Sequence, residues 1–351
     1  MDVVAIDNGD LQRPARIKDV AARAGVSLKT VTNVVHERPY VKDETRARVL
    51  AAIEELDYRP SLAGRQLQSG RSNMITLAVP RIDEPYLGAL AHELIAAAAP
   101  RGYTVVMDET GGKVEREEQA ARGYPGHGID GVIYSPLALN PQLLADMSRN
   151  TPMVLLGEPL PGSSADYVAI DNPSSAREVV DHLIDQGRQH FRYLGGQPDL
   201  YPGVGEQRAI AVGQRLAEHG VAPDDLVIRT GRFRREEGAR RIAENLDRLR
   251  GCDALICASD LLALGAMHAL LQAGITVPDD IALVGWDNIE DGAYGHPSLS
   301  SVAPDLPALA EKAVDAVITR IEGDRSDSRT YVVPHELVVR ESSRGRRTPL
   351  A

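Results

Sequence analysis

The sequence predicts an α/β protein with an N-terminal all-α headpiece, a hinge helix, and a core of two doubly wound α/β subdomains. Two observations lead to this fold class. Between residues 17 and 56, apolar side chains recur at helical spacing in three short blocks. From Asn73 onward, apolar strand-like runs alternate with amphipathic helical stretches, a pattern typical of parallel sheets covered by helices on both faces.

The three N-terminal blocks predict a helix-turn-helix. They contain Val20, Ala21 and Ala24, then Val31, Val34 and Val35, then Val49, Leu50, Ile53 and Leu56. Gly25 follows the first block, where a residue without a Cβ adopts the left-handed backbone of a tight turn. Ser27 is placed to cap the second helix. In such a motif the second helix enters the DNA major groove.

The polar face of the second helix supplies the candidate DNA-binding residues. Lys29 can donate to guanine or phosphate, Asn33 can bond adenine through two hydrogen bonds, and Leu28 can contact a thymine methyl. Ser27 and Thr30 suit phosphate oxygens. Thr32 and His36 share this face. A small three-helix bundle with a merely solvated polar face is the alternative.

The segment after the third helix adds a hinge. Tyr58-Arg59-Pro60 stops the helix, and SLAGRQLQSGRS is too short to be a stable helix alone. The motifs DVAARAGVS, VKDETRARVLAAIEELDYRP and Leu67 resemble the headpiece and hinge of the lactose-repressor (LacI) family. The resemblance implies that two hinge helices pair on an operator, with Leu67 wedged into the minor groove. Packing of Leu67 on the neighbouring domain is the alternative.

Two positions depart from the family pattern. Thr32-Asn33 stands where the family usually has Ser-Arg, so no base preference is carried over. Gly64 stands where the hinge usually has alanine, and glycine inside a helix costs about 1 kcal/mol relative to alanine. We therefore expect this hinge to be harder to order, which would make operator affinity more dependent on dimer contacts.

Charge is distributed unevenly along the chain of 351 residues, whose formal net charge is -11. Residues 13–72 hold 12 Lys/Arg and 7 Asp/Glu, a net of +5, whereas residues 73–351 carry a net of -13. This arrangement concentrates attraction for DNA phosphates on the headpiece.

The core resembles the family's effector-binding core, which is built like the periplasmic sugar-binding proteins. The most specific matches are ASDLLALGAMHALLQAGITVPDDIALVGWDN and SLSSVAPDLPALAEKAVDAVITRIEG, and the whole resemblance extends from Arg16 to Ser343. It implies three crossings between the subdomains, which would allow closure round a ligand. The expected organisation is a disordered tail (1–15), headpiece (16–60), hinge (61–72), core (73–343) and tail (344–351). Within the core, subdomain 1 is expected at about 73–165 plus 300–325, and subdomain 2 at about 166–298 plus 330–343.

A ligand site is expected between the carboxyl ends of the strands of the two subdomains. The resemblance assigns ligand contacts to Asp287 and Arg208, whose alternatives are a helix cap and a surface ion pair. Trp286 and Phe233 are expected beside a ligand, with core packing as the competing interpretation. The remaining candidates are Asp83, Tyr86, Glu158 and Ser259. Asp83 could instead cap a helix, and Asp260 is expected to cap the helix that follows it.

The residue pattern favours a sugar or sugar-like polyol as effector, because planar charged groups such as carboxylates and guanidinium groups form paired hydrogen bonds with hydroxyls. We find no P-loop, no dinucleotide fingerprint and no Cys/His metal spacing, so no cofactor, metal or catalytic residue is expected. Cys252 and Cys257 lie in or beside an apolar strand, where small buried thiols are usual. The absence of a signal sequence and of a membrane-spanning run favours a cytoplasmic protein with no membrane partner.

These observations predict a homodimeric regulator that binds a pseudo-palindromic, double-stranded operator and is not an enzyme. Whether the effector is an inducer or a corepressor stays open. A glycosidase using Asp83 and Asp287 and a solute-binding protein of a transporter are the alternatives. The C-terminal RGRRTPLA has no leucine heptad, so a dimer is expected rather than a tetramer.

Overall fold

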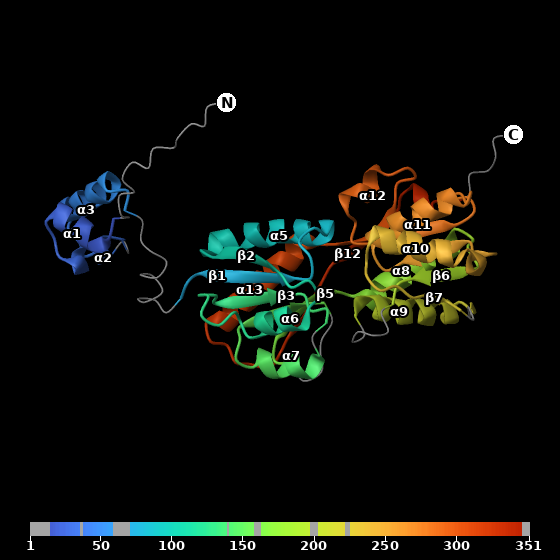
Figure 1. Ribbon diagram of the computed structural model, residues 1–351, viewed down its shortest axis with the longest axis horizontal. Coiled ribbons are helices and arrows are strands. Elements are labelled where there is room, and N and C mark those ends of the chain that lie inside the picture. Colours follow the sequence, from blue (N-terminus) through green and yellow to red (C-terminus); the bar gives the residue numbers. More distant parts are fainter. Residues whose placement is uncertain are drawn as a thin grey trace, which may run out of the picture. The chain divides into compact units, whose positions relative to one another are not determined.

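The computed structural model describes residues 15–35, 38–58, 71–138, 140–157, 163–196, 203–221 and 225–345. The chain divides into two compact units, Met1–Ser72 and Asn73–Ala351 (Figure 1). The expected N-terminal tail and hinge helix, with Gly64 and Leu67, fall on residues outside these ranges or at their edges. None of the helices within the described ranges is long and apolar enough to cross a membrane.

The first unit contains the predicted helix-turn-helix. Its helices are α1 (Ile17–Ala24), α2 (Leu28–Val35) and α3 (Asp43–Glu55). Gly25 ends α1 with φ of 65°, and its N–H donates to the carbonyl oxygens of Ala21 and Ala22. Ser27 Oγ accepts from the N–H of Thr30 at 3.2 Å, which confirms its predicted position at the start of α2.

The apolar core of the headpiece contains one fully buried valine from each helix. Val20, Val31 and Val49 are fully buried, as the periodicity predicted. Leu50 belongs to the same apolar block as Val49 but is 52% exposed, because it points away from the other two helices. An ion pair between Arg23 and Glu55 at 2.6 Å joins α1 to the end of α3.

The second unit has two lobes, each built on a six-stranded sheet (Figure 1). Lobe 1 has strand order β11-β5-β4-β3-β1-β2, and all its pairings are parallel. Its strands are β1 (Met74–Val79), β2 (Thr104–Glu109), β3 (Gly131–Tyr134), β4 (Met153–Leu156), β5 (Asp166–Ile170) and β11 (Thr330–Val333). Its helices are α5 (Pro85–Ala98), α6 (Val114–Ala121), α7 (Pro141–Ser148) and α13 (Leu306–Ile321), with a 3-10 turn at Ala99–Arg101.

Alternate strand residues of lobe 1 face different helix layers, as the pleat of a strand requires. Ile133 and Val154 share a core with the apolar side chains of α5 and α13. Val132, Met153 and Leu155 face the opposite side, where α6 and α7 cover the sheet.

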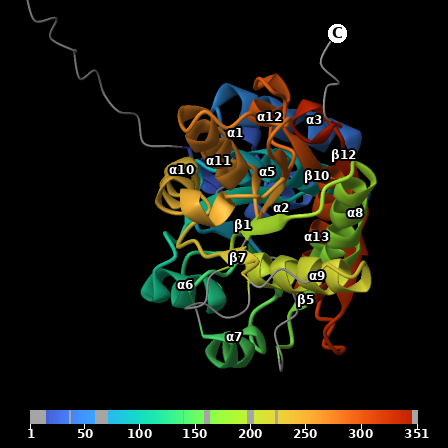
Figure 2. The same cartoon turned by 90° about the vertical axis from the view of Figure 1, so that its right-hand side faces the viewer.

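Lobe 2 has strand order β12-β10-β9-β8-β6-β7, with β12 antiparallel to β10. Its strands are β6 (Phe191–Leu194), β7 (Val227–Ile228), β8 (Ala254–Cys257), β9 (Ala282–Trp286), β10 (Ser300–Pro304) and β12 (His335–Val338). Its helices are α8 (Asn172–Asp185), α9 (Val204–Glu218), α10 (Arg235–Glu244), α11 (Asp260–Gln272) and α12 (Glu290–Tyr294), with 3-10 turns at Leu246–Leu249 and Glu341–Ser343. Figure 2 views this lobe end-on, with α10 and α11 together on one side and α8 and α9 on the other.

The predicted α/β class is confirmed, but the division of strands between the subdomains was wrong at three places. β5 belongs to lobe 1, β10 to lobe 2 and β11 to lobe 1. The connection from β4 to β5 contains no helix in the part that the structure describes, so the alternation of strand and helix wrongly placed β5 at the start of the second set. The chain therefore crosses between the lobes next to Asp171, Asp305 and Pro334. The N–H of Asp305 donates to the carbonyl oxygen of Pro334 at 3.0 Å, which ties two crossings together.

Helices α10 and α11 approach so closely that glycine is required at their contact. A Cβ built on Gly265 would lie 1.9 Å from the carbonyl oxygen of Arg235, and one on Gly238 would lie 2.3 Å from that of Leu262. Backbone atoms cannot move aside as a flexible side chain can, so neither position has room for alanine.

We expect Gly265→Ala to reduce the free energy of unfolding of the second unit by at least about 1–3 kcal/mol, the usual cost of overpacking. Gly213→Ala in α9 is the matched control, because the nearest atom to its added Cβ lies at an ordinary 3.5 Å. The control should be neutral or stabilising, by up to about 1 kcal/mol. Equal unfolding free energies for the two variants, measured by denaturant titration, would contradict this account of the α10–α11 contact.

Candidate functional site

The exposed face of α2 carries most of the predicted DNA-binding side chains. Ser27, Leu28 and Lys29 are exposed, with Leu28 at 51%, while Thr30, Thr32 and Asn33 are half-buried. Asn33 Oδ1 accepts from the hydroxyl of the exposed Tyr40 at 3.3 Å. His36 and Leu67 lie outside the described residues, so their predicted roles stay predictions.

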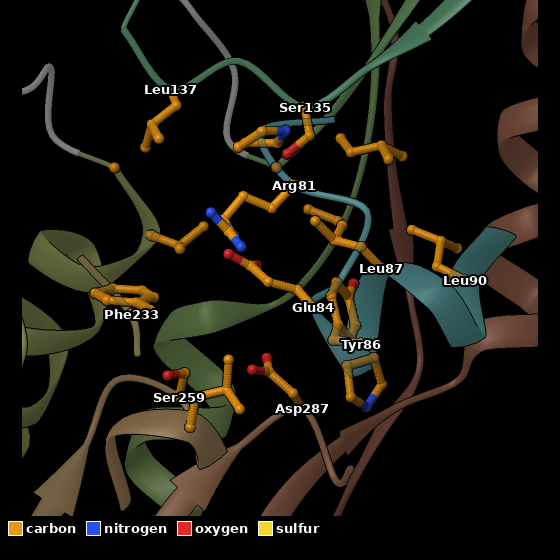
Figure 3. Close-up of a pocket in the computed structure, with 18 of the residues that line it drawn as sticks. Arg81, Glu84, Tyr86, Leu87, Leu90, Ser135, Leu137, Phe233, Ser259 and Asp287 are labelled. Carbon is orange, nitrogen blue, oxygen red and sulfur yellow. The ribbon is translucent and has the colours of Figure 1, made fainter. Parts of the chain in front are cut away.

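A cavity of about 300 Å³ lies between the two lobes of the second unit (Figure 3). Residues that follow β1, β3, β7, β8 and β9 line it, since the carboxyl ends of the parallel strands of both sheets face this space. Tyr86, Arg208, Phe233, Ser259 and Asp287 of the predicted set line this cavity. Glu158 lies outside the described residues, although the adjacent Gly157 is a lining residue.

Arg208 is almost completely buried, at 7% exposure, and its hydrogen-bond acceptors among the described residues are neutral. Its Nε donates to Asn172 Oδ1 at 2.8 Å, and its Nη1 donates to the carbonyl oxygen of Ala258 at 2.7 Å. The guanidinium carbon lies 5.1 Å from the ring centre of Trp286, within the range of a cation–π contact. Arg208 is therefore oriented by neutral hydrogen-bond acceptors, and it is not the surface ion pair of the alternative interpretation.

Trp286 was predicted beside a ligand, but it does not line the cavity. The side chain is fully buried, and its Nε1 donates to Ser175 Oγ at 3.3 Å. Burial of so large a ring behind Arg208 stabilises the lobe and supports the guanidinium. The structural interpretation of Trp286 is the correct one.

The helix cap expected of Asp260 is supplied by Ser259, which also lines the cavity. Ser259 Oγ caps α11 by accepting from the N–H of Leu262 at 3.3 Å. Asp260 is fully buried and accepts from the hydroxyl of Ser301 at 2.7 Å and from the N–H of Ile289 at 2.9 Å. Burial raises the pKa of Asp260 to about 7, although these two hydrogen bonds oppose the shift. Asp260 thus ties α11 to β10 and to the segment after β9.

Asp287 enters the cavity from an unusual backbone conformation. Its φ is 104°, and its N–H donates to the carbonyl oxygen of Val302 at 2.9 Å. Burial raises the pKa of Asp287 well above its usual range, while the charge of Arg208 acts in the opposite direction. The carboxylate of Glu84 lies across the cavity from that of Asp287 in Figure 3, and burial also raises the pKa of Glu84.

Asp83, another predicted contact, lies outside the cavity. Its side chain is 61% exposed and forms an ion pair with Arg81. Its neighbours Arg81 and Glu84 line the cavity instead, so the prediction selected the right loop and the wrong residue. The only available signal was position after β1, which does not tell which of the three charged residues Arg81, Asp83 and Glu84 points inward.

Sequence reasoning also missed Arg232 and Arg234, which line the cavity on either side of Phe233. All three follow β7 at the same sheet edge as Asp287. Phe233 packs so closely on α9 that a Cβ on Gly205 would lie 2.7 Å from its Cζ. The run of arginines in GRFRR was visible, but its placement depended on recognising the two-residue strand β7.

Glu117 is a further residue that the sequence did not single out. This carboxylate of α6 is fully buried and accepts from the hydroxyl of Tyr134 at 2.8 Å. It also accepts from the backbone N–H groups of Leu137 at 3.1 Å and Ala138 at 2.9 Å. Because Ser135, Pro136 and Leu137 line the cavity, Glu117 holds one of its walls in place.

Both cysteines are buried, as predicted, and burial raises the pKa of each thiol. Among the described residues, no group of three or more His, Cys, Asp or Glu side chains is arranged to hold a metal ion.

A three-helix DNA-binding headpiece followed by a two-lobed core with a cavity between parallel sheets defines a class of ligand-responsive bacterial transcriptional regulators. Residues 16–61 match the family described as bacterial regulatory proteins, lacI family, and residues 180–343 match a periplasmic binding protein-like domain. The chain belongs to the LacI family and is a DNA-binding transcriptional regulator.

Named relatives cover almost the whole chain. The ribose operon repressor of Halalkalibacterium halodurans is 32% identical over 94% of this chain and 97% of its own length. The transcriptional regulator CelR of Thermobifida fusca is 30% identical over 94% of this chain and 99% of its own. The transcriptional repressor PurR of Aliivibrio salmonicida is 29% identical over 93% and 98%. These relatives are named as regulators and not as enzymes.

Solved structures of transcriptional regulators also match almost the whole chain. The lac repressor dimer bound to operator and the anti-inducer ONPF has a TM-score of 0.85 and 25% identity, covering 95% of this chain and 100% of its own. A CelR–cellobiose complex has a TM-score of 0.67 and 28% identity, covering 93% and 99%.

The raised pKa of Asp287 predicts a pH-dependent stability. The folded state retains this proton at pH values where the unfolded chain, with a pKa near 3.8, has lost it. The stabilisation is therefore fully present below the unfolded pKa and is lost as the pH rises through the folded value. We expect the melting temperature of Asp287→Asn to fall less than that of the parent between about pH 5 and about pH 8. Asp247→Asn, whose parent side chain is 88% exposed, is the control, and a variant whose pH profile parallels the parent would refute the prediction.

The contacts of Glu117 predict a local effect of Glu117→Gln. Weakening charge-assisted hydrogen bonds should speed hydrogen exchange at the amides of Leu137 and Ala138. It should also reduce the free energy of unfolding by about 1–3 kcal/mol. Glu115→Gln changes an exposed side chain of the same helix and is the control. It should change neither the exchange of these two amides nor the free energy of unfolding. Unchanged exchange at the two amides of the Glu117 variant would show that Glu117 does not hold this wall.

Proposed function

We propose that the protein is a homodimeric repressor of sugar-utilisation genes, whose operator affinity changes when a sugar-like effector binds between the lobes of the core. One observation carries the proposal: the buried Arg208 has no ion-pair partner among the described residues and lines the cavity between the lobes. A guanidinium group held in this way at 7% exposure is a preorganised hydrogen-bond donor for a polar ligand. The ribose repressor and the cellobiose complex among the relatives support a sugar.

The headpiece supplies the DNA contacts in this proposal. Lys29, Thr32 and Asn33 read base edges in the major groove, while Ser27 and Thr30 contact phosphates. Two headpieces related by a two-fold axis read a pseudo-palindromic operator, with Leu67 as the proposed minor-groove wedge. The protein would act in the cytoplasm, where the chromosome is accessible.

The core supplies the switch. An effector that contacts Asp287 and Arg208 in lobe 2 and Tyr86 in lobe 1 favours closure about the three crossing segments. Closure changes the spacing of the two hinges in the dimer and hence operator affinity. By linkage, the operator then changes effector affinity by the same factor. An effector that weakens operator binding is an inducer, and one that strengthens it is a corepressor.

An enzyme with the same core is not the proposal we favour. The glycosidase hypothesis paired Asp83 with Asp287, and Asp83 is outside the cavity, in an ion pair with Arg81. A nucleophile or metal motif that would support another reaction is likewise missing from the residue pattern.

Asn33→Ala tests the DNA-reading face. Losing a two-bond contact to a base should weaken binding to an operator selected in vitro by about 1–3 kcal/mol. Non-specific DNA affinity should change little, because phosphate contacts remain. Asn150→Ala, an exposed asparagine of the core, is the matched control. Equal operator affinities of the parent and the Asn33 variant, measured by fluorescence anisotropy, would remove Asn33 from the interface.

A further inference from the structure

Positive side chains outnumber negative ones around the cavity, although the protein as a whole is acidic. Four arginines line it, Arg81, Arg208, Arg232 and Arg234, against two carboxylates, Glu84 and Asp287. These arginines come from both lobes, since Arg81 follows β1 in lobe 1 and the others belong to lobe 2.

Three of the four arginines have no close carboxylate partner within the described part of the chain. Arg81 is paired with Asp83. Arg234 is 4.0 Å from Glu236, whose side chain is 87% exposed, so this contact is largely screened by water. Arg208 has neutral acceptors only, and no ion pair of Arg232 is found. The cavity therefore carries positive charge that the protein itself does not neutralise.

Two carboxylates line the cavity beside these four arginines. Burial raises the pKa of both Glu84 and Asp287, which means that their ionised forms are disfavoured in the cavity. Arg234 lies close enough to lobe 1 for its charge to lower the pKa of Glu84 and of Asp83. A group bound near Arg234 is thus within the electrostatic reach of both lobes.

Two helix ends add to the positive potential. The N-terminal residues of α9 and α10 at the cavity, Gly203 and Arg234, have no side-chain cap for their free N–H groups. Unpaired N–H groups and the helix dipole both favour an anion.

From these observations we infer that the effector is an anionic monosaccharide derivative, whose carboxylate or phosphate binds Arg232 and Arg234 while its hydroxyls bind Asp287 and Arg208. This inference rests on the proposed function and narrows its effector class. A neutral sugar would exclude water from these cations on closure and give them no counter-charge, which is unfavourable. An anionic group forms two-bond contacts with guanidinium groups and neutralises them.

The test compares matched neutral and anionic sugars on the full-length protein by calorimetry. The ligands are glucose, glucuronate and glucose 6-phosphate, ribose and ribose 5-phosphate, with inorganic phosphate as a probe of the anion site alone. We expect at least one anionic sugar to bind about tenfold or more tightly than its neutral counterpart, a difference of about 1.4 kcal/mol. Preference for glucuronate or for the phosphates decides which anionic group is recognised.

Single substitutions test which arginines are responsible for the preference for anionic sugars. Arg232→Ala and Arg234→Ala should each reduce the anionic advantage severalfold and leave affinity for the neutral sugar unchanged. Arg250→Ala removes a cation that is 84% exposed and pairs with Asp247, and it should change neither affinity. The inference is wrong if every anionic sugar binds no better than its neutral counterpart, or if both cavity variants keep the full advantage. Operator affinity without ligand is measured on the same proteins, and loss of DNA binding by the parent would refute the regulator proposal separately.

Discussion

Much of the core depends on one constraint, namely that the carboxyl ends of two parallel sheets face the same cavity. A parallel sheet places the loops that follow its strands at one edge. Arg81 and Glu84 after β1 and Asp287 after β9 therefore meet across a common space, although they are far apart in the chain. Helices that begin at this edge direct their N-termini at the same space and add to the positive charge of the four lining arginines.

Arg208 shows how the fold prepares such a site. Its guanidinium is held by Asn172 of α8 and by the carbonyl oxygen of Ala258 after β8, and it lies over the ring of Trp286. Each partner comes from a different element of lobe 2, so the orientation of Arg208 depends on the packing of the whole lobe. Asp260 plays a similar structural part beneath the cavity by joining α11 to β10. β10 is continuous with a crossing segment, since it ends at Pro304 next to Asp305.

The general fold could be read from the sequence because it depends on periodicity. Three apolar blocks at helical spacing, each with one fully buried valine, identified the headpiece, and alternating strands and helices identified the α/β core. Membership of β5, β10 and β11 in their sheets could not be read, because it depends on where along the chain the crossings between the lobes fall. A local pattern contains no information about pairing between distant segments.

The same distinction applies to the site. Asp287, Arg208 and Phe233 were found because the motifs around them resemble those of the family, and for Asp287 its position at a strand end pointed the same way. The direction in which a side chain points within a loop was not predictable, so Asp83 was selected in place of its neighbours Arg81 and Glu84. Trp286 was misplaced because its side chain points to the interior of lobe 2 and not to the cavity. Glu117 was missed because a charged helix residue gives no sign of burial.

The most direct test of this account is reciprocal linkage between the cavity and the headpiece. The affinity of the sugar that binds best should be measured on the free protein and on the protein saturated with its selected operator. The account predicts that the two affinities differ, and by the same factor by which that sugar changes operator affinity. Equal sugar affinities in the presence and absence of operator would contradict it, because the cavity would then have no influence on DNA binding.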